Sequence, residues 1–207
     1  MSAAINQFRD ALVRLSPYPL SLAQVDACAR HFELLLKWNK RLNLTRIIDP
    51  LEAAKLHYAE SLFAAQFIKP GDRVIDVGSG AGFPGIPLAI VSSQAEFTLL
   101  ESHGKKAVFL RESIRAVGLT NTTTALARFE EYQITENILT SRAIEGFESL
   151  LPAFFGIAPV QRLLLFLGNQ NTACATDIAG AAWQCEAVTL PSGSDRSLLI
   201  ATRLSST

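Results

Sequence analysis

Residues that build metal sites or disulfide frameworks are scarce in this sequence. Its 207 residues include three cysteines, which show no Cys-x-x-Cys spacing, and three histidines that lie far apart in the chain. An odd number of widely spaced cysteines gives no disulfide framework, and neither residue type clusters as zinc ligands do. We therefore expect no metal site and a reduced, cytoplasmic setting.

Long apolar runs and an excess of one charge are also absent. The longest apolar stretches, Leu150–Val160 and Leu163–Leu167, are shorter than the roughly 20 residues that span a bilayer. Lys and Arg number 19, as do Asp and Glu, so the formal net charge is zero and no global field draws the protein onto nucleic acid or a membrane. Residues 1–10 lack the basic and apolar regions of a signal peptide. These absences predict a soluble protein without a membrane partner, and they allow an enzyme that docks through one local patch.

The chain divides into two parts of different pattern. Residues up to 69 carry helical signals: Ser21 with Gln24, and Asp49 with Glu52, fit capping boxes that precede apolar residues at helical spacing. A Lys-Pro-Gly-Asp turn signal follows at residues 69–72. We expect an N-terminal helical cap over residues 1–69 and a second domain over residues 70–207.

The second part alternates between short β-branched runs and helical patterns. Strands are predicted at 73–77, 97–100, 122–126, 138–141, 162–167, 183–190 and 198–203, and helices at 84–91, 105–117, 145–155 and 172–181. Such alternation predicts an α/β fold whose mostly parallel sheet is covered on both faces. The last two strands form a hairpin, which we expect to add an antiparallel strand at one edge.

A glycine-rich segment, DVGSGAGFPG at residues 76–85, directly follows the first of these strands and opens a helix. A GxGxxG match begins at Gly80, as in dinucleotide-binding proteins. That fingerprint starts directly after its strand, however, and counting from Gly78 places Phe83 where its last glycine belongs. The carboxylate of Asp76 would repel a pyrophosphate, whereas it would attract the ammonium group of S-adenosylmethionine. The loop therefore favours S-adenosylmethionine.

A second acidic residue strengthens the prediction of an adenosine ligand. Glu101 ends the next strand, 23 residues after Gly78, and a carboxylate at that distance accepts hydrogen bonds from ribose hydroxyls in both cofactor classes. Taken singly, Asp76 is equally consistent with a capped turn and Glu101 with a solvated strand end. Together with the loop, the two residues predict a cofactor site beyond the carboxyl ends of the strands.

From about residue 38 to residue 143 the chain resembles the glucose-inhibited division protein B family, methyltransferases that modify N7 of a guanosine in 16S ribosomal RNA. The resemblance rests on the segments KWNK with NLT, His57 with Glu60-Ser61, Asp76 through Pro87, LLES with Lys105-Lys106, Phe109-Leu110-Arg111, Arg128-Phe129-Glu130, and Ser141-Arg142-Ala143. The string GFPGIP at residues 82–87 is far more specific than a glycine count.

The resemblance implies a class I methyltransferase fold, a Rossmann-like seven-stranded sheet behind an N-terminal helical cap. It implies that Gly78, Gly80 and Phe83 line the S-adenosylmethionine site and that Glu101 holds the ribose. Phe129 and Glu130 would lie beside the adenine. Arg142 would face both the cofactor and the reaction centre, and a structural salt bridge is the alternative for this residue.

Basic residues occur in two groups, at Lys37, Lys40 and Arg41 and at Lys105 and Lys106. One interpretation is a patch that binds RNA phosphates, and the other is an ordinary solvated helix face. We interpret Trp38 as a packing residue and His57 as a structural histidine between cap and domain.

Two departures from the family pattern concern polar positions. Leu167-Gly168 stands where the family usually has Lys-Gly, and Asn137 stands where it tends to carry Asp. Losing a lysine near the presumed RNA side would weaken phosphate contact, which bears on the substrate and on activity but leaves the cofactor site intact.

The predicted function is transfer of a methyl group from S-adenosylmethionine to guanine N7, with 16S ribosomal RNA or the small ribosomal subunit as partner of a monomer. Because N7 carries an unprotonated lone pair, alignment of the reactants matters more than a general base, and Arg142 could bond the neighbouring O6. Three alternatives stay open: a small-molecule methyltransferase, a nicotinamide-dependent oxidoreductase, and a non-catalytic RNA-binding relative.

Overall fold

The computed structural model describes residues 3–142, 147–193 and 195–204. The start of the predicted helix 145–155 and Ala143 of the Ser-Arg-Ala string lie outside these residues. Within the described chain, the strands are β1 Arg73–Val77, β2 Glu96–Glu101, β3 Thr122–Leu126, β4 Ile138–Arg142, β5 Arg162–Gly168, β6 Trp183–Thr189 and β7 Arg196–Arg203.

The helices of the described chain follow the predicted pattern, with shorter turns between them. The α-helices are α1 Ala3–Leu15, α2 Leu22–Leu42, α3 Pro50–Glu52, α4 Glu60–Phe63, α5 Gly85–Val91, α6 Gly104–Val117, α7 Phe147–Gly156 and α8 Asn169–Ala179. A π-helical segment, η1, spans Ala53–Ala59, and 3₁₀ turns are η2 Ala64–Phe67, η3 Phe129–Glu131 and η4 Gly180–Ala182.

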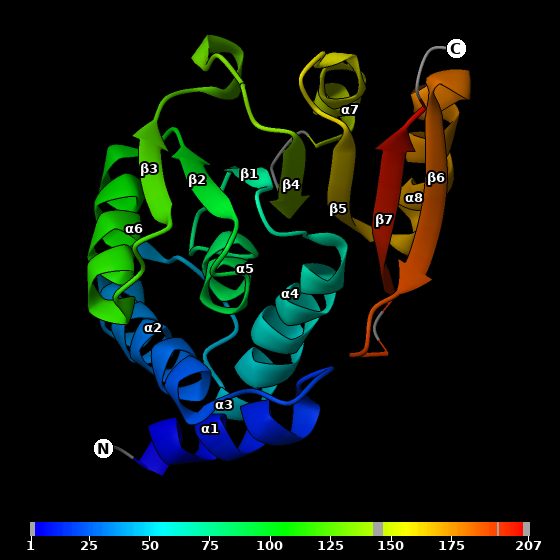
Figure 1. The fold of residues 1–207 in the computed structure, drawn as a ribbon. Coiled ribbons are helices and arrows are strands. Elements are labelled where there is room, and N and C mark those ends of the chain that lie inside the picture. Colours follow the sequence, from blue (N-terminus) through cyan, green and yellow to red (C-terminus); the bar gives the residue numbers. More distant parts are fainter. Residues whose placement is uncertain (1–2, 143–146, 194, 205–207) are drawn as a thin grey trace.

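The strands form one seven-stranded sheet in the order β3-β2-β1-β4-β5-β7-β6 (Figure 1). Neighbours from β3 to β5 are parallel, and β7 is antiparallel to both β5 and β6. This confirms the predicted class I methyltransferase fold. The predicted terminal hairpin lies at one edge of the sheet and supplies its antiparallel strand, but that strand, β7, is the inner one of the hairpin and β6 forms the edge itself. Burial explains the order: residues 197–201 of β7 are buried, whereas β6 exposes about half of its residues.

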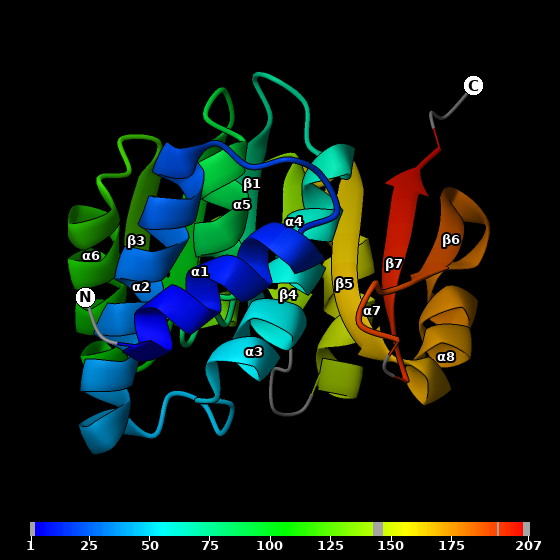
Figure 2. The same cartoon turned by 90° about the horizontal axis from the view of Figure 1, so that it is seen from below.

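Helices cover both faces of the sheet. Side chains of β1, β4 and β5 that point one way pack with α7 and α8 in one apolar cluster, which includes Ile75, Leu139 and Leu165. The opposite face packs against α4, α5 and α6, and α1 and α2 extend that layer (Figure 2). Residues 3–69 therefore reinforce one side of the sheet only.

The long helix α2 begins and ends where its sequence predicts. Ser21 and Gln24 form the predicted capping box, with reciprocal bonds of 3.2 and 2.9 Å between side chains and backbone N–H groups. Asn43 ends the helix in the left-handed conformation at φ 48°. Asp49 accepts bonds from two backbone N–H groups at the start of α3, but no reciprocal bond from Glu52 is found among the described residues.

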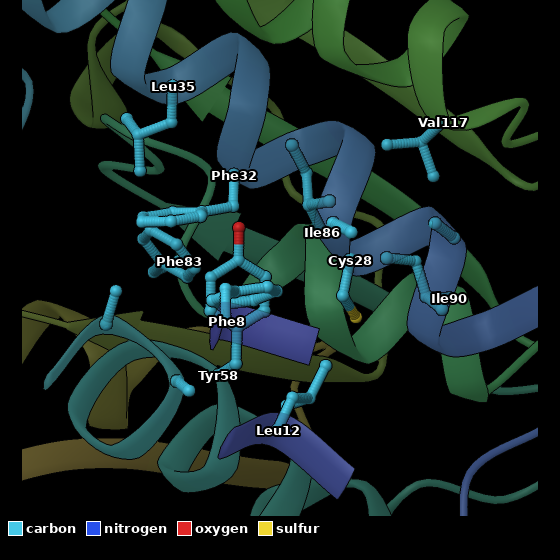
Figure 3. Packing of buried hydrophobic residues seen from close by; sticks show 14 of the residues in the cluster. Phe8, Leu12, Cys28, Phe32, Leu35, Tyr58, Phe83, Ile86, Ile90 and Val117 are labelled. Atoms are coloured by element: carbon cyan, nitrogen blue, oxygen red, sulfur yellow. The ribbon is translucent and has the colours of Figure 1, made fainter. Parts of the chain in front are cut away.

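The cap and the glycine loop share one core. Phe8 of α1 stacks on Phe32 of α2 at 4.5 Å between ring centroids, and Tyr58 of η1 meets Phe8 edge-on at 4.8 Å (Figure 3). Phe83, from the glycine loop, meets the same Tyr58 ring at 5.0 Å. Apolar burial of such rings is the dominant favourable term in folding, so the loop is held by helices that precede it in the sequence.

His31 of α2 joins this core to the loop by two hydrogen bonds. The Tyr58 hydroxyl lies 2.8 Å from Nδ1, and the Ala81 carbonyl lies 3.1 Å from Nε2. Because a carbonyl only accepts, Nε2 carries the proton and Nδ1 accepts from Tyr58. His31 is fully buried, and this burial lowers its pKa from 6.5 to about 3.

Asn137 directly precedes β4, at the amino ends of the parallel strands, whereas the glycine loop lies at their carboxyl ends. Its amide donates to Asp72 at 2.7 Å, and its carbonyl accepts from the Arg73 N–H at 2.7 Å. An aspartate at 137 would face the Asp72 carboxylate at the distance of this hydrogen bond. The departure from the family pattern is thus matched by a local partner and does not touch the predicted site.

Leu167 is 2% exposed and belongs to the apolar cluster beneath α7 and α8. The expectation that this position lies on an open RNA-binding side is therefore wrong for the side chain present here. Leucine fits because the position points into the core.

We predict that acidification destabilises the protein through its two buried histidines. Burial lowers the pKa of His57 as well, to about 3. Below pH 6.5 both histidines therefore become protonated in the unfolded chain but stay neutral in the folded chain. The contribution of the two histidines to stability is then full above pH 6.5 and falls by about 1.4 kcal/mol per pH unit for each, whereas Asp76, whose pKa burial raises to about 7, contributes a slope of opposite sign below that pH. Urea unfolding at pH 7.5, 6.0 and 5.0 measures this slope.

The substitution His31→Gln keeps one donor and one acceptor while removing one titrating group. It should therefore remove the share of one histidine from the acid destabilisation, and adding His57→Gln should remove the share of the other, which leaves the opposite slope of Asp76. An unchanged slope in the double variant would contradict the assignment.

We also predict that Asn137→Asp destabilises the protein by about 1–3 kcal/mol at pH 7, because a half-buried hydrogen bond becomes a pair of facing carboxylates. The reciprocal double variant Asp72→Asn with Asn137→Asp restores one amide and one carboxylate. It should recover most of the lost free energy in urea unfolding. Equal destabilisation of the single and double variants would show that the pairing does not matter.

Candidate functional site

The glycine loop follows β1 directly and lies at the carboxyl end of that strand, beside the carboxyl ends of β2 and β4. Strand order reverses at β1, since β2 and β3 lie on one side of it and β4 and β5 on the other. Ligands of open α/β sheets bind beyond the carboxyl ends of the strands at such a switch point. The N–H groups of Gly78 and Ser79 both donate to the Leu100 carbonyl, which fixes the loop against β2.

Two glycines of the loop are required by their surroundings. Gly80 and Gly82 have positive φ values of 52° and 86°. A Cβ on Gly82 would also lie 3.0 Å from a side-chain carbon of Ile86 and 3.2 Å from Nε2 of His31. One side of the loop thus packs closely against the cap. The other side faces the carboxyl ends of the strands.

A pocket of about 530 Å³ lies at this switch point, a volume typical of small-ligand sites. Cap, loop and strand ends all contribute to it. Its lining comprises Leu44, Thr45, His57, Gly78, Ser79, Gly80, Ala81, Phe83, Glu101, Ser102, His103, Lys106 and Arg142. Of the predicted cofactor residues it brings together Gly78, Gly80, Phe83, Glu101 and Arg142. Asp76, Phe129 and Glu130 do not line it.

Asp76 lies beneath the loop rather than on the pocket surface. Its Oδ2 accepts the Gly85 N–H at 3.1 Å, and its Oδ1 is buried without a hydrogen-bond partner in the described chain. Burial raises the pKa of Asp76 from 3.8 to about 7. A Cβ on Gly85 would lie 2.7 Å from Oδ2, so this glycine lets the carboxylate reach the helix start.

Glu101 is held rigidly at the rim of the pocket. The Gly80 N–H donates to Oε2 at 2.9 Å, and the His103 N–H donates to Oε1 at 2.8 Å. Glu101 is only 5% exposed, which excludes the alternative of a solvated strand end. Oε1 also lies 3.3 Å from Nδ1 of His103, whereas Oε2 keeps a lone pair beyond its backbone bond and can accept a further hydrogen bond.

Arg142 ends β4 and forms the structural salt bridge that was the alternative interpretation of this residue. Its Nη2 donates to Oε2 of Glu60 at 2.6 Å and to the Leu56 carbonyl at 2.6 Å. Its Nη1 is buried and has no hydrogen-bond partner among the described residues. Burial lowers the pKa of Arg142 from 12.5 to about 10, so the guanidinium stays charged at neutral pH. One nitrogen anchors the side chain, and the other has no partner in the described part of the chain.

Glu60, the anchor of Arg142, is a fully buried carboxylate of the cap. Besides Arg142 it accepts bonds from the Ser192 hydroxyl and from Arg196, whose nitrogen lies 3.1 Å from Oε1. Buried charges require such partners, because leaving one unpaired costs several kcal/mol. The cap is thereby tied to β4 and to the β6–β7 hairpin at once.

His57 is the pocket residue whose position sequence reasoning did not anticipate. Its ring stacks on Phe83 at 4.5 Å with 14° between the planes, and its Nε2 lies 2.9 Å from the Thr45 hydroxyl. The predicted contact between cap and domain is confirmed by this stacking. The same ring also lines the pocket. This position depends on the contact between η1 and the glycine loop, which are far apart in the sequence.

Phe129 and Glu130 lie in η3, just after β3. Phe129 packs edge-on against Phe154 at 5.0 Å, and Glu130 is exposed. The Ala127 N–H donates to the Glu101 carbonyl, so η3 follows a segment joined to the pocket rim. Their contact with adenine stays a prediction.

The predicted RNA-binding lysines and arginine divide between two hollows. Lys106 lines the pocket, whereas Lys37, Lys40, Arg41 and Lys105 line a neighbouring hollow. Trp38 packs edge-on against Phe109 at 5.9 Å, as expected of a packing residue. Over the described residues no group of three or more potential metal ligands is found, and no helix is long and apolar enough to cross a membrane.

Comparison with known proteins gives a consistent result. The profile of the GidB family, described as rRNA small subunit methyltransferase G, matches residues 24–173. A ribosomal RNA small subunit methyltransferase G of Solibacter usitatus is 36% identical over 180 residues, which cover 84% of this chain and 86% of that protein. The protein of that name from Dichelobacter nodosus is 40% identical over 136 residues, 65% of this chain and 64% of its own length.

Solved structures share the fold at low sequence identity. Precorrin-6y C5,15-methyltransferase from Geobacter metallireducens is 13% identical with a TM-score of 0.54, over 80% of this chain and 92% of that one. The M. jannaschii TYW2 structure, in complex with AdoMet, is 14% identical with a TM-score of 0.52, over 70% and 75% of the two chains. Because the family profile matches residues 24–173, which include the glycine loop, Glu101 and Arg142, this chain belongs to the rRNA small subunit methyltransferase G (GidB) family.

Proposed function

We propose that this protein transfers the methyl group of S-adenosylmethionine to N7 of a guanosine in 16S ribosomal RNA. The observation that carries the proposal is the pocket at the strand switch point, which joins a fixed carboxylate, Glu101, to a guanidinium with one nitrogen unpartnered, Arg142. Family membership supplies the reaction class, and the pocket supplies groups that suit its two reactants.

The pocket fits S-adenosylmethionine better than a dinucleotide. In dinucleotide sites the pyrophosphate binds free N–H groups at the first helix start, but here the Gly85 N–H is taken by Asp76. Phe83 and Gly85 are buried at the same place, so a pyrophosphate has no access there. The nicotinamide-dependent alternative is thereby disfavoured on geometry, whereas the charge of Asp76, which lies beneath the loop, does not decide between the two cofactors.

The residues that would hold the cofactor come from adjacent strand ends. Glu101 would accept the ribose hydroxyls, the backbone of Gly78 and Gly80 allows close approach, and the unpartnered Oδ1 of Asp76 lies beneath that backbone. Phe129 and Glu130 would bound the adenine, from beside the rim. When bound, S-adenosylmethionine supplies a methyl group on a positively charged sulfur, which is a good leaving group.

Arg142 would orient the guanine. Guanine presents N7 and O6 as neighbouring acceptors on one edge, and the buried Nη1 of Arg142 is a donor in need of a partner. A bond to O6 would align N7 without removing its lone pair, and such alignment is the main requirement for this transfer. The neutral His57 ring, held against Phe83, would help exclude water from the same space.

The cap and the partner follow from the same arrangement. We propose residues 1–69 as a cap that forms one wall of the pocket, since Leu44, Thr45 and His57 line it. One chain supplies the whole lining, so a monomer suffices for the reaction. The proposed partner is the small ribosomal subunit or its RNA, which places the reaction in the bacterial cytoplasm.

Methyl transfer from labelled S-adenosylmethionine to small subunits that lack the family's N7 mark tests the function. Label in a single guanosine of 16S RNA is the expected result. No label, with cofactor bound, would overturn the proposal and leave another acceptor or a non-catalytic role.

We predict that Arg142→Lys lowers kcat about 100-fold while cofactor affinity changes less than about threefold. Lysine can keep the ion pair with Glu60, but it loses the second guanidinium nitrogen that would meet O6. Single-turnover methylation and calorimetric titration of the cofactor separate the two effects. Normal turnover in a folded Arg142→Lys variant would dismiss the orienting role.

We predict that Glu101→Gln weakens S-adenosylmethionine binding by about tenfold or more, since bonds to a charged acceptor contribute about 1.5–3 kcal/mol. The amide would also point a donor at one of the two backbone N–H groups. Glu112→Gln, on the exposed face of α6, is the matched control and should bind normally in the same titration. Equal affinities for the two variants would remove Glu101 from the cofactor site.

A further inference from the structure

A second hollow of about 550 Å³ lies between the end of α2 and the start of α6. Its lining is of two kinds. Four cations come from the two helices, Lys37, Lys40, Arg41 and Lys105, and the apolar members are Trp38, Leu42 and Val108. The proposed function makes no use of this combination.

The positive charge of the hollow is not neutralised in place. Lys37 pairs with Glu33 at 2.9 Å, but in the described part of the chain Lys40, Arg41 and Lys105 form no ion pair. In a protein of zero net charge, such local accumulation of one sign marks a surface for an anion.

Lysines at the start of α6 are electrostatically unfavourable for the helix itself. A helix N-terminus carries partial positive charge and favours acidic residues, yet the first turn of α6 has none, and His103 provides no side-chain cap. Lys105 and Lys106 add two more positive charges there. Helix stability does not account for them, whereas binding of a phosphate does.

The floor of the hollow is apolar and open. Val108 is 41% exposed, Leu42 is half-buried, and the half-buried Trp38 ring is steadied by its edge-on contact with Phe109. A site for a bare phosphate has no need of such a floor. An apolar surface bordered by cations suits an unpaired nucleotide, whose base packs on apolar groups while its phosphate meets lysine or arginine.

The hollow continues into the cofactor pocket along two consecutive stretches. On α6, Lys105 lines the hollow and the next residue, Lys106, lines the pocket. On the cap, Leu42 lines the hollow and Leu44 lines the pocket. An RNA strand with one nucleotide in the pocket can therefore pass directly over residues 105–106 into the hollow.

We propose that this hollow binds an unpaired nucleotide next to the target guanosine on the same RNA strand, an inference that rests on the proposed function. The flanking base occupies the apolar floor and its phosphate lies among the lysines. The hollow thereby fixes the register of the strand, so that one guanosine reaches the pocket.

Charge removal tests the phosphate contacts. Lys40→Gln with Lys105→Gln should raise KM for small subunits about tenfold and leave cofactor affinity unchanged. The slope of log KM against log salt should fall by about 1.4 for two lost contacts to a single strand. The control, Arg14→Gln with Lys69→Gln, removes the same charge elsewhere and should match wild type. Equal KM values for the two double variants would overturn the inference.

A photoreactive residue at position 108 identifies the occupant. Crosslinking of the Val108→benzoylphenylalanine variant to small subunits should label the RNA within a few nucleotides of the methylated guanosine. A crosslink to a ribosomal protein, or to distant RNA, would overturn the inference. If the wild-type protein transfers no methyl group to these subunits, the proposed function fails and the inference with it; if it does, the inference stands or falls on the variants alone.

Discussion

The rest of the structure depends on the close contact between the glycine loop and the cap. His31 bonds to the Tyr58 hydroxyl through one ring nitrogen and to the Ala81 carbonyl through the other, and Phe83 packs among the aromatic rings of the cap (Figure 3). One side of the loop is buried by these contacts, so its backbone can turn only toward the strand ends. The pocket exists because helices that come first in the chain complete the shape of a loop that follows them.

Ion pairs also join the cap to the sheet, at the Arg142 side of the pocket. Glu60 holds Arg142 from the cap and also meets Ser192 and Arg196 of the hairpin. Such a buried network is costly to break, because a charge would be left without a partner. It therefore fixes three distant parts of the chain in one arrangement and holds the guanidinium of Arg142, whose Nη1 has no partner among the described residues, in one position.

Much of this could be predicted from local patterns. Strand and helix periodicity predicted the elements of the sheet, and strand ends with polar residues indicated Glu101 and Arg142. The insertion of β7 could not be predicted, since strand order depends on which strand is buried on both sides. His57 and the cap wall of the pocket arise from tertiary contact. Asp76 could have been placed, because it alternates with Val77 on β1 and so points to the face that α5 covers.

The missing lysine at position 167 has a counterpart on the neighbouring strand. In the antiparallel register of β5 and β7, Gly168 faces Arg196, and Leu167 faces Ser197. Arg196 therefore brings a positive charge to the same edge of the sheet, where it meets Glu60. Leu167 therefore packs in the core, and Arg196 on the neighbouring strand carries the positive charge at this end of the strands. A cation on β7 thus lies beside the position where the family usually has lysine.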